Sequence, residues 1–125
     1  MRQYFIEIPY PPSNNHYYMN VRGGRRIIHP KNGVPYVDFI IKYLSSTFST
    51  TDGWDPLSGR LKVEIVLHMP DRRRRDIDNA GGKAVTDSFT KSGFWLDDSQ
   101  IDDLRIRRAE LIKNGRAYIL IEELS

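Results

Sequence analysis

The sequence contains no cysteine and no long run of apolar residues. Without cysteine, the chain can form neither a disulfide nor a metal site built on thiolates. No stretch approaches the ~18 consecutive apolar residues that a membrane span requires. The N-terminus leads directly into a short alternating segment without an apolar leader. We therefore expect a cytoplasmic protein that is neither exported nor inserted into a membrane.

Histidines are also scarce. The three histidines, His16, His29 and His68, are too widely separated for a zinc motif.

The length of the chain leaves little room for a second domain. A chain of 125 residues that is 39% hydrophobic fits one globular domain, which buries roughly two-thirds of its unfolded surface. We expect residues 1–125 to form that single domain.

The apolar pattern predicts two main helices and several strands. Helical spacing runs from Pro35 to Phe48 and again over 83–92, where Gly93 is a plausible stop. Strand-like patterns are listed here in chain order: Tyr4–Ile8, two short strands flanking a basic turn within 21–30, Leu61–His68, Leu104–Ile112 and Arg116–Glu122. Residues 11–18, with two prolines, are expected to be irregular, and 50–59 to be a loop.

The order of these elements predicts an α+β fold rather than a doubly wound sheet. Helices and strands do not strictly alternate, which favours a mixed sheet of about four to five strands with two main helices. Asn114-Gly115 is the preferred pair for a type I′ turn. We therefore expect the chain to end in a β-hairpin.

Positive charge is gathered in arginine clusters. The chain has a net charge of +3 and a pI near 9.3. The three clusters are Arg22, Arg25 and Arg26; Arg72, Arg73, Arg74 and Arg75; and Arg105, Arg107 and Arg108. Clustered cations favour a polyanionic partner, which they would bind with strong dependence on salt.

The second arginine cluster adjoins two carboxylates, Asp76 and Asp78. In extended chain, side chains two residues apart point the same way, so these carboxylates would converge. Convergent carboxylate oxygens suit Mg²⁺, which usually keeps several waters and a substrate phosphate as further ligands. The alternative is a solvated loop in which the acids and arginines neutralise one another.

A second acidic stretch follows the second predicted helix. A strand, a crossing helix and a return would bring Asp97 or Asp98 to Asp76 and Asp78, with residues 94–96 anchored in the core. Carboxylates gathered around a divalent cation suit phosphodiester hydrolysis, because Mg²⁺ activates water and stabilises charge on the phosphate. Capping and turn chemistry is the alternative for these aspartates. We favour that alternative for Asp102 and Asp103.

Three further residues have two plausible roles each. Lys83 could stabilise developing negative charge or orient the attacking water, or it could be a surface charge near Asp87. Tyr17 and Tyr18 could stack on unpaired bases or pack in the core.

Three ordered motifs are distributed along the chain. They are Pro11-Pro12-Ser13-Asn14-Asn15 with Tyr17-Tyr18, then residues 68–79 (HMPDRRRRDIDN), then residues 90–100 (TKSGFWLDDSQ). On these motifs the sequence resembles the RusA family of Holliday junction resolvases, small bacterial endonucleases often carried by prophages.

The resemblance implies a homodimer that binds four-way DNA junctions during recombination and repair. Such an enzyme makes paired, symmetric nicks with Mg²⁺ or Mn²⁺. The family's metal-binding acids fall on Asp76, Asp78 and Asp98, and its essential lysine falls on Lys83. The match to Asp97 is weaker. The arginines from Arg72 to Arg75 would hold phosphate backbones, while Tyr17 or Tyr18 would contact opened bases near the branch.

One departure from the family pattern precedes Lys83. Three residues, Ala80, Gly81 and Gly82, separate Asn79 from Lys83, where the family has two. Glycine is unfavourable inside a helix, so we expect Gly81-Gly82 to absorb the extra residue before the regular helix begins. Otherwise the ammonium group would be misplaced and turnover impaired.

Two other functions stay open at the level of sequence. The first is a catalytically silent DNA-binding protein with the same fold, which only the extra residue before Lys83 supports. The second is a metal-dependent hydrolase of small phosphate esters, which would have no need of three basic clusters.

Overall fold

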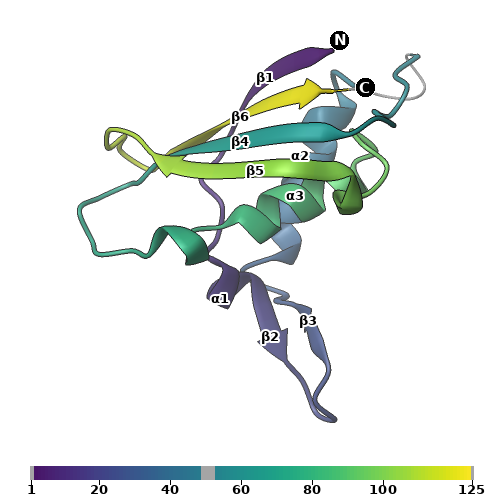
Figure 1. Ribbon diagram of the computed structural model, residues 1–125. Helices are drawn as coiled ribbons and strands as arrows, with labels where there is room; N and C mark the ends of the chain where they lie inside the picture. Colours follow the sequence, from purple (N-terminus) through teal and green to yellow (C-terminus); the bar gives the residue numbers. More distant parts are fainter. Residues whose placement is uncertain (1, 49–52, 125) are drawn as a thin grey trace.

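The computed structural model describes residues 2–48 and 53–124 and shows the expected α+β fold (Figure 1). Its main sheet is mixed and has the strand order β1 (Gln3–Ile8), β6 (Arg116–Glu123), β4 (Leu61–His68) and β5 (Ile101–Arg108). A separate two-stranded sheet pairs β2 (Tyr18–Asn20) with β3 (Arg26–Ile28). The predicted loop at 50–59 falls partly outside the described residues.

A crossover connects the two parallel strands of the main sheet. The chain leaves β4, forms the short turn η2 (Ile77–Asn79) and helix α3 (Gly82–Lys91), and then passes through the turn η3 (Asp98–Gln100) into β5. Parallel neighbours need such a connection, and β5 accordingly pairs in parallel with β4. This unit positions both acidic motifs, one before α3 and one after it.

The last two strands are antiparallel but do not pair directly. Their connection contains the expected tight turn, with Asn114 and Gly115 both at positive φ (71° and 74°). However, β4 lies between β5 and β6 in the sheet. The chain therefore makes the predicted C-terminal hairpin turn, but β6 pairs with β4 and β1 rather than with β5.

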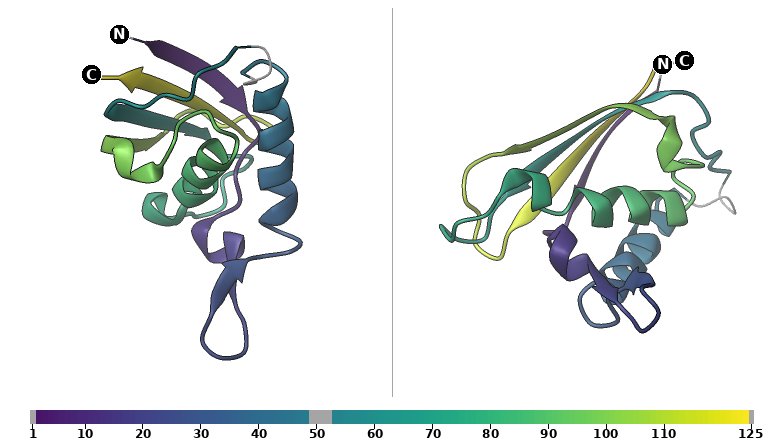
Figure 2. Two further views of the ribbon diagram at one scale, coloured as in Figure 1. Left: turned by 90° about the vertical axis from the view of Figure 1, so that its right-hand side faces the viewer. Right: turned by 60° about the horizontal axis from the view of Figure 1, so that its bottom comes forward.

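Helices α2 (Val34–Ser45) and α3 cover the same face of the sheet, as the two views in Figure 2 show. Helix α2 has a proline in its first turn, as expected, and it buries Val37, Ile40 and Leu44. The core also takes in Phe89, Phe94 and Trp95. Leu96, expected in the core with Phe94 and Trp95, is instead 61% exposed.

The proline-rich connector contains a short helix that the sequence did not predict. Helix α1 (Asn14–Tyr17) begins where the Ser13 side chain accepts a hydrogen bond from the backbone N–H of His16. Strands β2 and β3 then flank the basic turn, as predicted, and form an arm that projects from the body (Figure 1).

No helix within residues 2–48 and 53–124 combines the length and apolar character that crossing a bilayer would take.

Candidate active site

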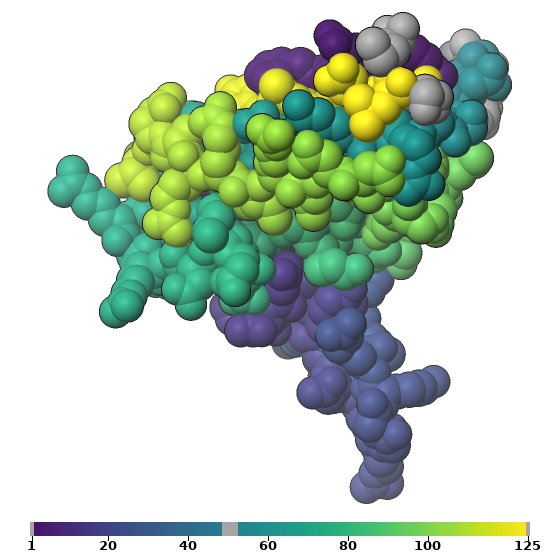
Figure 3. Space-filling model, viewed as in Figure 1, coloured from purple at the N-terminus to yellow at the C-terminus, as the bar shows by residue number. Residues whose placement is uncertain are grey.

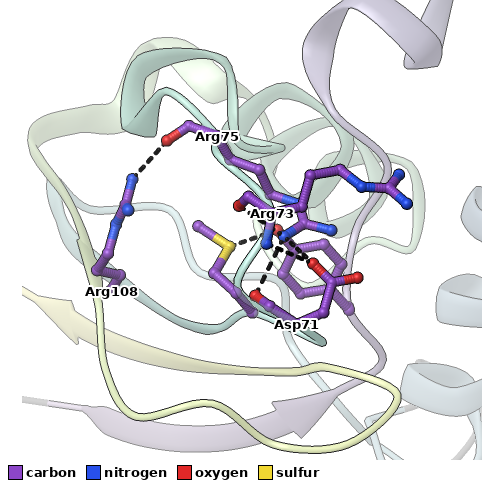
Figure 4. A network of polar contacts seen from close by, with 6 residues as sticks. Asp71, Arg73, Arg75 and Arg108 are labelled. Atoms are coloured by element: carbon purple, nitrogen blue, oxygen red, sulfur yellow. Dashed lines mark hydrogen bonds and ion pairs between the residues drawn. The ribbon is translucent and has the colours of Figure 1, made fainter.

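The arginine-rich loop after β4 is held together by its own side chains. The Asp71 carboxylate accepts hydrogen bonds from the Arg73 backbone N–H at 2.9 Å and from the Arg75 guanidinium at 2.8 Å (Figure 4). Arg108, on β5, donates to the Arg75 carbonyl at 2.7 Å. The hydrogen bond from Arg75 is the main cause that lowers the pKa of the Asp71 carboxyl below its usual value.

This network divides the four arginines into two kinds. Arg75 has only 22% of its side chain exposed and forms an ion pair with Asp71. Arg72, Arg73 and Arg74 are exposed, and within the described residues none of their guanidinium groups forms an ion pair. The free positive charge of the loop therefore resides on residues 72–74.

Asp76 and Asp78 follow directly but do not lie in one extended strand. Asp76 has extended backbone angles (φ −86°, ψ 131°), whereas Asp78 lies in the turn η2. Both side chains are exposed. The alternation expected of extended chain thus ends at Asp76, because the chain must turn there to enter α3.

The N-terminal motif docks against this turn. Asn14 donates from its side-chain amide to the Asp78 carbonyl at 3.2 Å and accepts from the Lys83 backbone N–H at 3.3 Å. The Asn15 backbone N–H donates to the Asn79 side chain at 3.2 Å. Two motifs more than 60 residues apart in the sequence therefore form one structural unit.

The regular helix α3 begins late, as predicted, although only Gly81 of the two glycines precedes it. Gly81 lies just outside the helix with φ +115°, and the helix begins at Gly82. A Cβ atom on Gly81 would lie 2.6 Å from Cγ of Pro11 and 2.9 Å from the Pro12 carbonyl. Glycine is thus required both by the left-handed backbone and by the close approach of residues 11–12. Lys83 then lies in the first turn of α3 with its side chain exposed.

Asp98 lies beyond the other end of α3. It is half-buried and accepts hydrogen bonds from the hydroxyl of Thr90 and, at 3.4 Å, from Nε1 of Trp95. The neighbouring Asp97 caps η3 through a capping box with Gln100. Hydrogen bonds that the Asp97 carboxylate accepts from Ser99 lower the pKa of this carboxyl.

The expected convergence of three carboxylates is not present in the described part of the chain. Helix α3 has ten residues and therefore spans about 15 Å, with η2 at its beginning and Asp98 near its end. Across residues 2–48 and 53–124, no three histidine, aspartate or glutamate side chains are grouped so as to hold a metal ion.

The two predicted base-stacking tyrosines have different environments. Tyr17 is completely buried, and its hydroxyl donates to the Asp87 carboxylate. Burial is the main cause that raises the pKa of the Tyr17 phenol, and the bond to Asp87 and the nearby Asp98 raise it further. This burial argues against base stacking by Tyr17. Tyr18 is half-buried, with the Arg26 guanidinium 4.1 Å from its ring centroid.

Two positions were underestimated from sequence alone. From the sequence, Asn14 has no role beyond its place in the first motif, and Asp87 is only a neighbour of Lys83. In the structure Asp87 instead pairs with Tyr17 and, at 3.7 Å, with Lys91. The spacing of four residues from Asp87 to Lys91 was a readable signal for that ion pair.

Comparisons with known proteins agree with the motifs. A family model described as Endodeoxyribonuclease RusA matches residues 9–122. The crossover junction endodeoxyribonucleases RusA of Escherichia coli (strain K12) and of Shigella sonnei (strain Ss046) are each 40% identical over 124 residues, which cover 99% of this chain and 98% of each relative. The protein of that name from Enterobacteria phage 82 matches with the same identity and coverage. The chain belongs to the RusA family of endodeoxyribonucleases.

Proposed function

We propose that this protein is a crossover junction endodeoxyribonuclease that resolves four-way DNA junctions by paired, symmetric nicks. The observation that carries the proposal is similarity over essentially the whole chain to proteins of that printed name. The geometry adds support, because the N-terminal motif and the acidic turn of residues 76–79 form one unit.

The exposed arginines supply the binding surface in this proposal. Arg72, Arg73 and Arg74 stand beside Asp76, in the same loop, and have no partner within the described residues that would neutralise them. Phosphate contacts of this kind position a duplex without reading its sequence. They would bring a phosphodiester to the two exposed carboxylates of Asp76 and Asp78.

The donor set at this turn fits Mg²⁺, with Mn²⁺ as the alternative. The exposed carboxylates of Asp76 and Asp78 are hard oxygen ligands, and Mg²⁺ commonly binds one or two carboxylates while keeping waters and a substrate phosphate. When bound, such an ion supplies water activation and charge stabilisation at phosphorus. We also propose Asp98 as a metal-binding acid, and this assignment depends on the family resemblance rather than on proximity to Asp76 and Asp78.

Lys83 has a role in this proposal that the shifted spacing leaves intact. Its backbone N–H is held by Asn14, which fixes the first turn of α3 against the acidic turn. Its side chain is exposed in the first turn of α3, directly after the acidic turn, and forms no ion pair within the described residues. A free cation at that point stabilises negative charge developing on a phosphate.

We also propose that the protein acts as a homodimer. A four-way junction presents two symmetry-related strands, and paired nicks require two equivalent active sites related by a twofold axis. One chain carries a single set of Asp76, Asp78 and Lys83 and would nick one strand at a time.

Cleavage of a labelled four-way junction by the purified protein tests the proposal. The protein is incubated with Mg²⁺ or with chelator, and cut positions are mapped on all four strands. A linear duplex and a small phosphate ester serve as control substrates. Paired, symmetric, metal-dependent nicks on the junction alone are expected. Tight binding without nicks would instead favour a silent DNA-binding protein, and ester hydrolysis without junction cleavage would favour a small-molecule phosphatase.

A further inference from the structure

The β2–β3 arm, defined here as residues 18–28, projects away from the body of the molecule. In Figures 1 and 3 it extends beyond α1 on the side opposite the main sheet. Its strands pair antiparallel, with Tyr18 opposite Ile28 and Asn20 opposite Arg26. The Val21 backbone N–H bonds to the Arg25 carbonyl at 2.8 Å, so the pairing continues toward the tip.

The root of the arm is held firmly against the rest of the protein. The His29 backbone N–H donates to the Tyr17 carbonyl at 2.8 Å. A Cβ atom on Gly33 would lie 2.5 Å from Ile28 and 2.7 Å from that same carbonyl, which shows how closely the root is packed. Because the buried Tyr17 also bonds to Asp87 on α3, the arm has a defined position relative to the crossover that carries the acids.

The outer part of the arm is cationic and thin. Arg22, Arg25 and Arg26 are all exposed, and within the described residues no carboxylate pairs with them. Gly23 and Gly24, at the tip, have positive φ, and a Cβ on either would meet no atom within 4 Å. The stacking of Arg26 on Tyr18 at 4.1 Å orients one of these charges without neutralising it. Such a surface suits a polyanion rather than an apolar partner.

The dimensions of the arm select one groove of a DNA duplex. Strands lie roughly 5 Å apart and rise about 3.3 Å per residue, so the paired part of the arm from Tyr18 to Val21 reaches roughly 10 Å. The major groove is about 12 Å wide and 8.5 Å deep and admits a two-stranded ribbon. In undistorted B-DNA the minor groove, about 6 Å wide, is too narrow for two strands with their side chains.

We infer that the β2–β3 arm is a DNA-binding ribbon that enters the major groove of a duplex arm, apart from the cleavage site. The inference deepens the proposed function, on which it rests for the identity of the duplex as an arm of a junction. The arm contributes affinity and orientation, and it takes no part in the chemistry.

Chemical footprinting of the junction tests this inference. Dimethyl sulfate methylates guanine N7 in the major groove and adenine N3 in the minor groove, so it distinguishes the two. The wild type is compared with the double variant Arg22→Ala and Arg25→Ala, with chelator present so that the strands stay intact. The charge-matched control is Lys42→Ala with Lys62→Ala, two positions on α2 and β4 outside the arginine clusters.

The wild type and the control are expected to protect guanine N7 within a duplex arm, and the arm variant is expected to lose that protection. For the arm variant, the slope of the log binding constant against log salt concentration is expected to be shallower by about 2, since two phosphate contacts are removed. Unchanged guanine protection in the arm variant, or protection of adenine N3 alone, would overturn the inference. A change in molecular mass of the arm variant would also overturn it, by making the arm a contact between copies of the chain.

Failure of this inference is distinguishable from failure of the proposed function. If the wild type leaves the junction uncut with Mg²⁺ but shows arm-dependent guanine protection, the nuclease proposal fails and the inference stands. If the arm variant cuts and protects the junction as the wild type does, the inference fails and the nuclease proposal stands.

Discussion

Gly81 determines how the N-terminal motif meets the acidic turn. Its φ of +115° is a conformation that residues with a Cβ rarely adopt, and residues 11–12 occupy the space that a side chain would need. The residue therefore does more than absorb an insertion. It lets the chain begin α3 while Pro11 and Pro12 pass close by and Asn14 reaches Asp78.

Gly81→Ala is expected to destabilise the protein by about 2–3 kcal/mol, since it adds a backbone strain of roughly 1 kcal/mol or more to a steric clash. Urea unfolding of the variant measures this loss. Gly93→Ala is the matched control, because Gly93 also has positive φ (+80°) but a Cβ there would meet no atom within 4 Å. Equal losses in the two variants would mean that the contact with residues 11–12 costs nothing.

Asp76→Asn is expected to reduce junction cleavage by about 100-fold or more, because removal of a proposed metal ligand would forfeit several kcal/mol of charge stabilisation. Binding of the junction should change little, since the cationic surface remains. Single-turnover cleavage and a binding titration measure the two effects separately. Asp103→Asn, on β5, is the control. Parallel loss of binding and cleavage in Asp76→Asn would contradict this division of labour.

At the scale of elements, the loop between β4 and η2 is shaped by an internal ion pair that leaves its other charges free. Asp71 holds Arg75, and Arg108 on β5 holds the Arg75 carbonyl (Figure 4). The loop is therefore anchored at Arg75, and the three preceding arginines point their charge outward from it.

The double variant Arg73→Ala and Arg74→Ala is expected to bind junctions more weakly, with a salt slope shallower by about 2. Titrations at several salt concentrations check this. Lys42→Ala with Lys62→Ala again provides the same loss of charge elsewhere. An unchanged slope would mean that Arg73 and Arg74 do not contact phosphates.

Helix α1 is joined to α3 by the buried hydroxyl of Tyr17, whose bond to Asp87 ties the N-terminal motif to the crossover. Tyr17→Phe is expected to cost about 2 kcal/mol of unfolding free energy at neutral pH, as for a hydrogen bond to a charged group. Urea unfolding measures the loss, with Tyr18→Phe as control. A loss no larger than that of the control would show that the bond adds nothing to stability.

The same tyrosine predicts a dependence on alkaline pH. Burial raises the pKa of the folded Tyr17 phenol above its unfolded value of 10.0. Folding therefore favours the neutral phenol, and this contribution is complete below pH 10 and is lost as pH rises beyond it. Comparing unfolding free energies at pH 8 and pH 11, we expect the wild type to lose more stability than Tyr17→Phe. Equal losses would show that Tyr17 does not contribute to alkaline unfolding.

At the scale of the whole molecule, the proposed functional groups either lie along a single crossover or are fixed to it. The arginine loop and the acidic turn precede α3, Asp98 follows it, and the basic arm is fixed to it through Tyr17. A homodimer with twofold symmetry would carry two copies of the arginine loop, the acidic turn, Asp98 and the arm, with no additional structural element.

We expect a mass of twice 14.6 kDa in solution, as the proposed paired nicking requires. Light scattering coupled to size-exclusion chromatography checks this at concentrations from low to high micromolar. A single species of 14.6 kDa throughout that range would contradict the homodimer.

Local patterns in the sequence were sufficient for most elements and for the family. The proline start and apolar spacing of α2, the late start of α3 and the Asn114-Gly115 turn are all confirmed. These features depend on residues within a few positions of one another. The family motifs are local in the same sense, and the comparisons agree with them.

The tertiary structure decided what depends on contacts between distant residues. It placed β4 between β5 and β6 and buried Tyr17 against Asp87. It also paired Arg75 with Asp71. Finally, it placed Asp98 at the opposite end of α3 from Asp76 and Asp78. Composition and spacing constrain which side chains a segment presents on each face. Which of those faces meet depends on packing across the whole chain, and the Tyr17–Asp87 bond, which joins residues 70 positions apart, is set at that level.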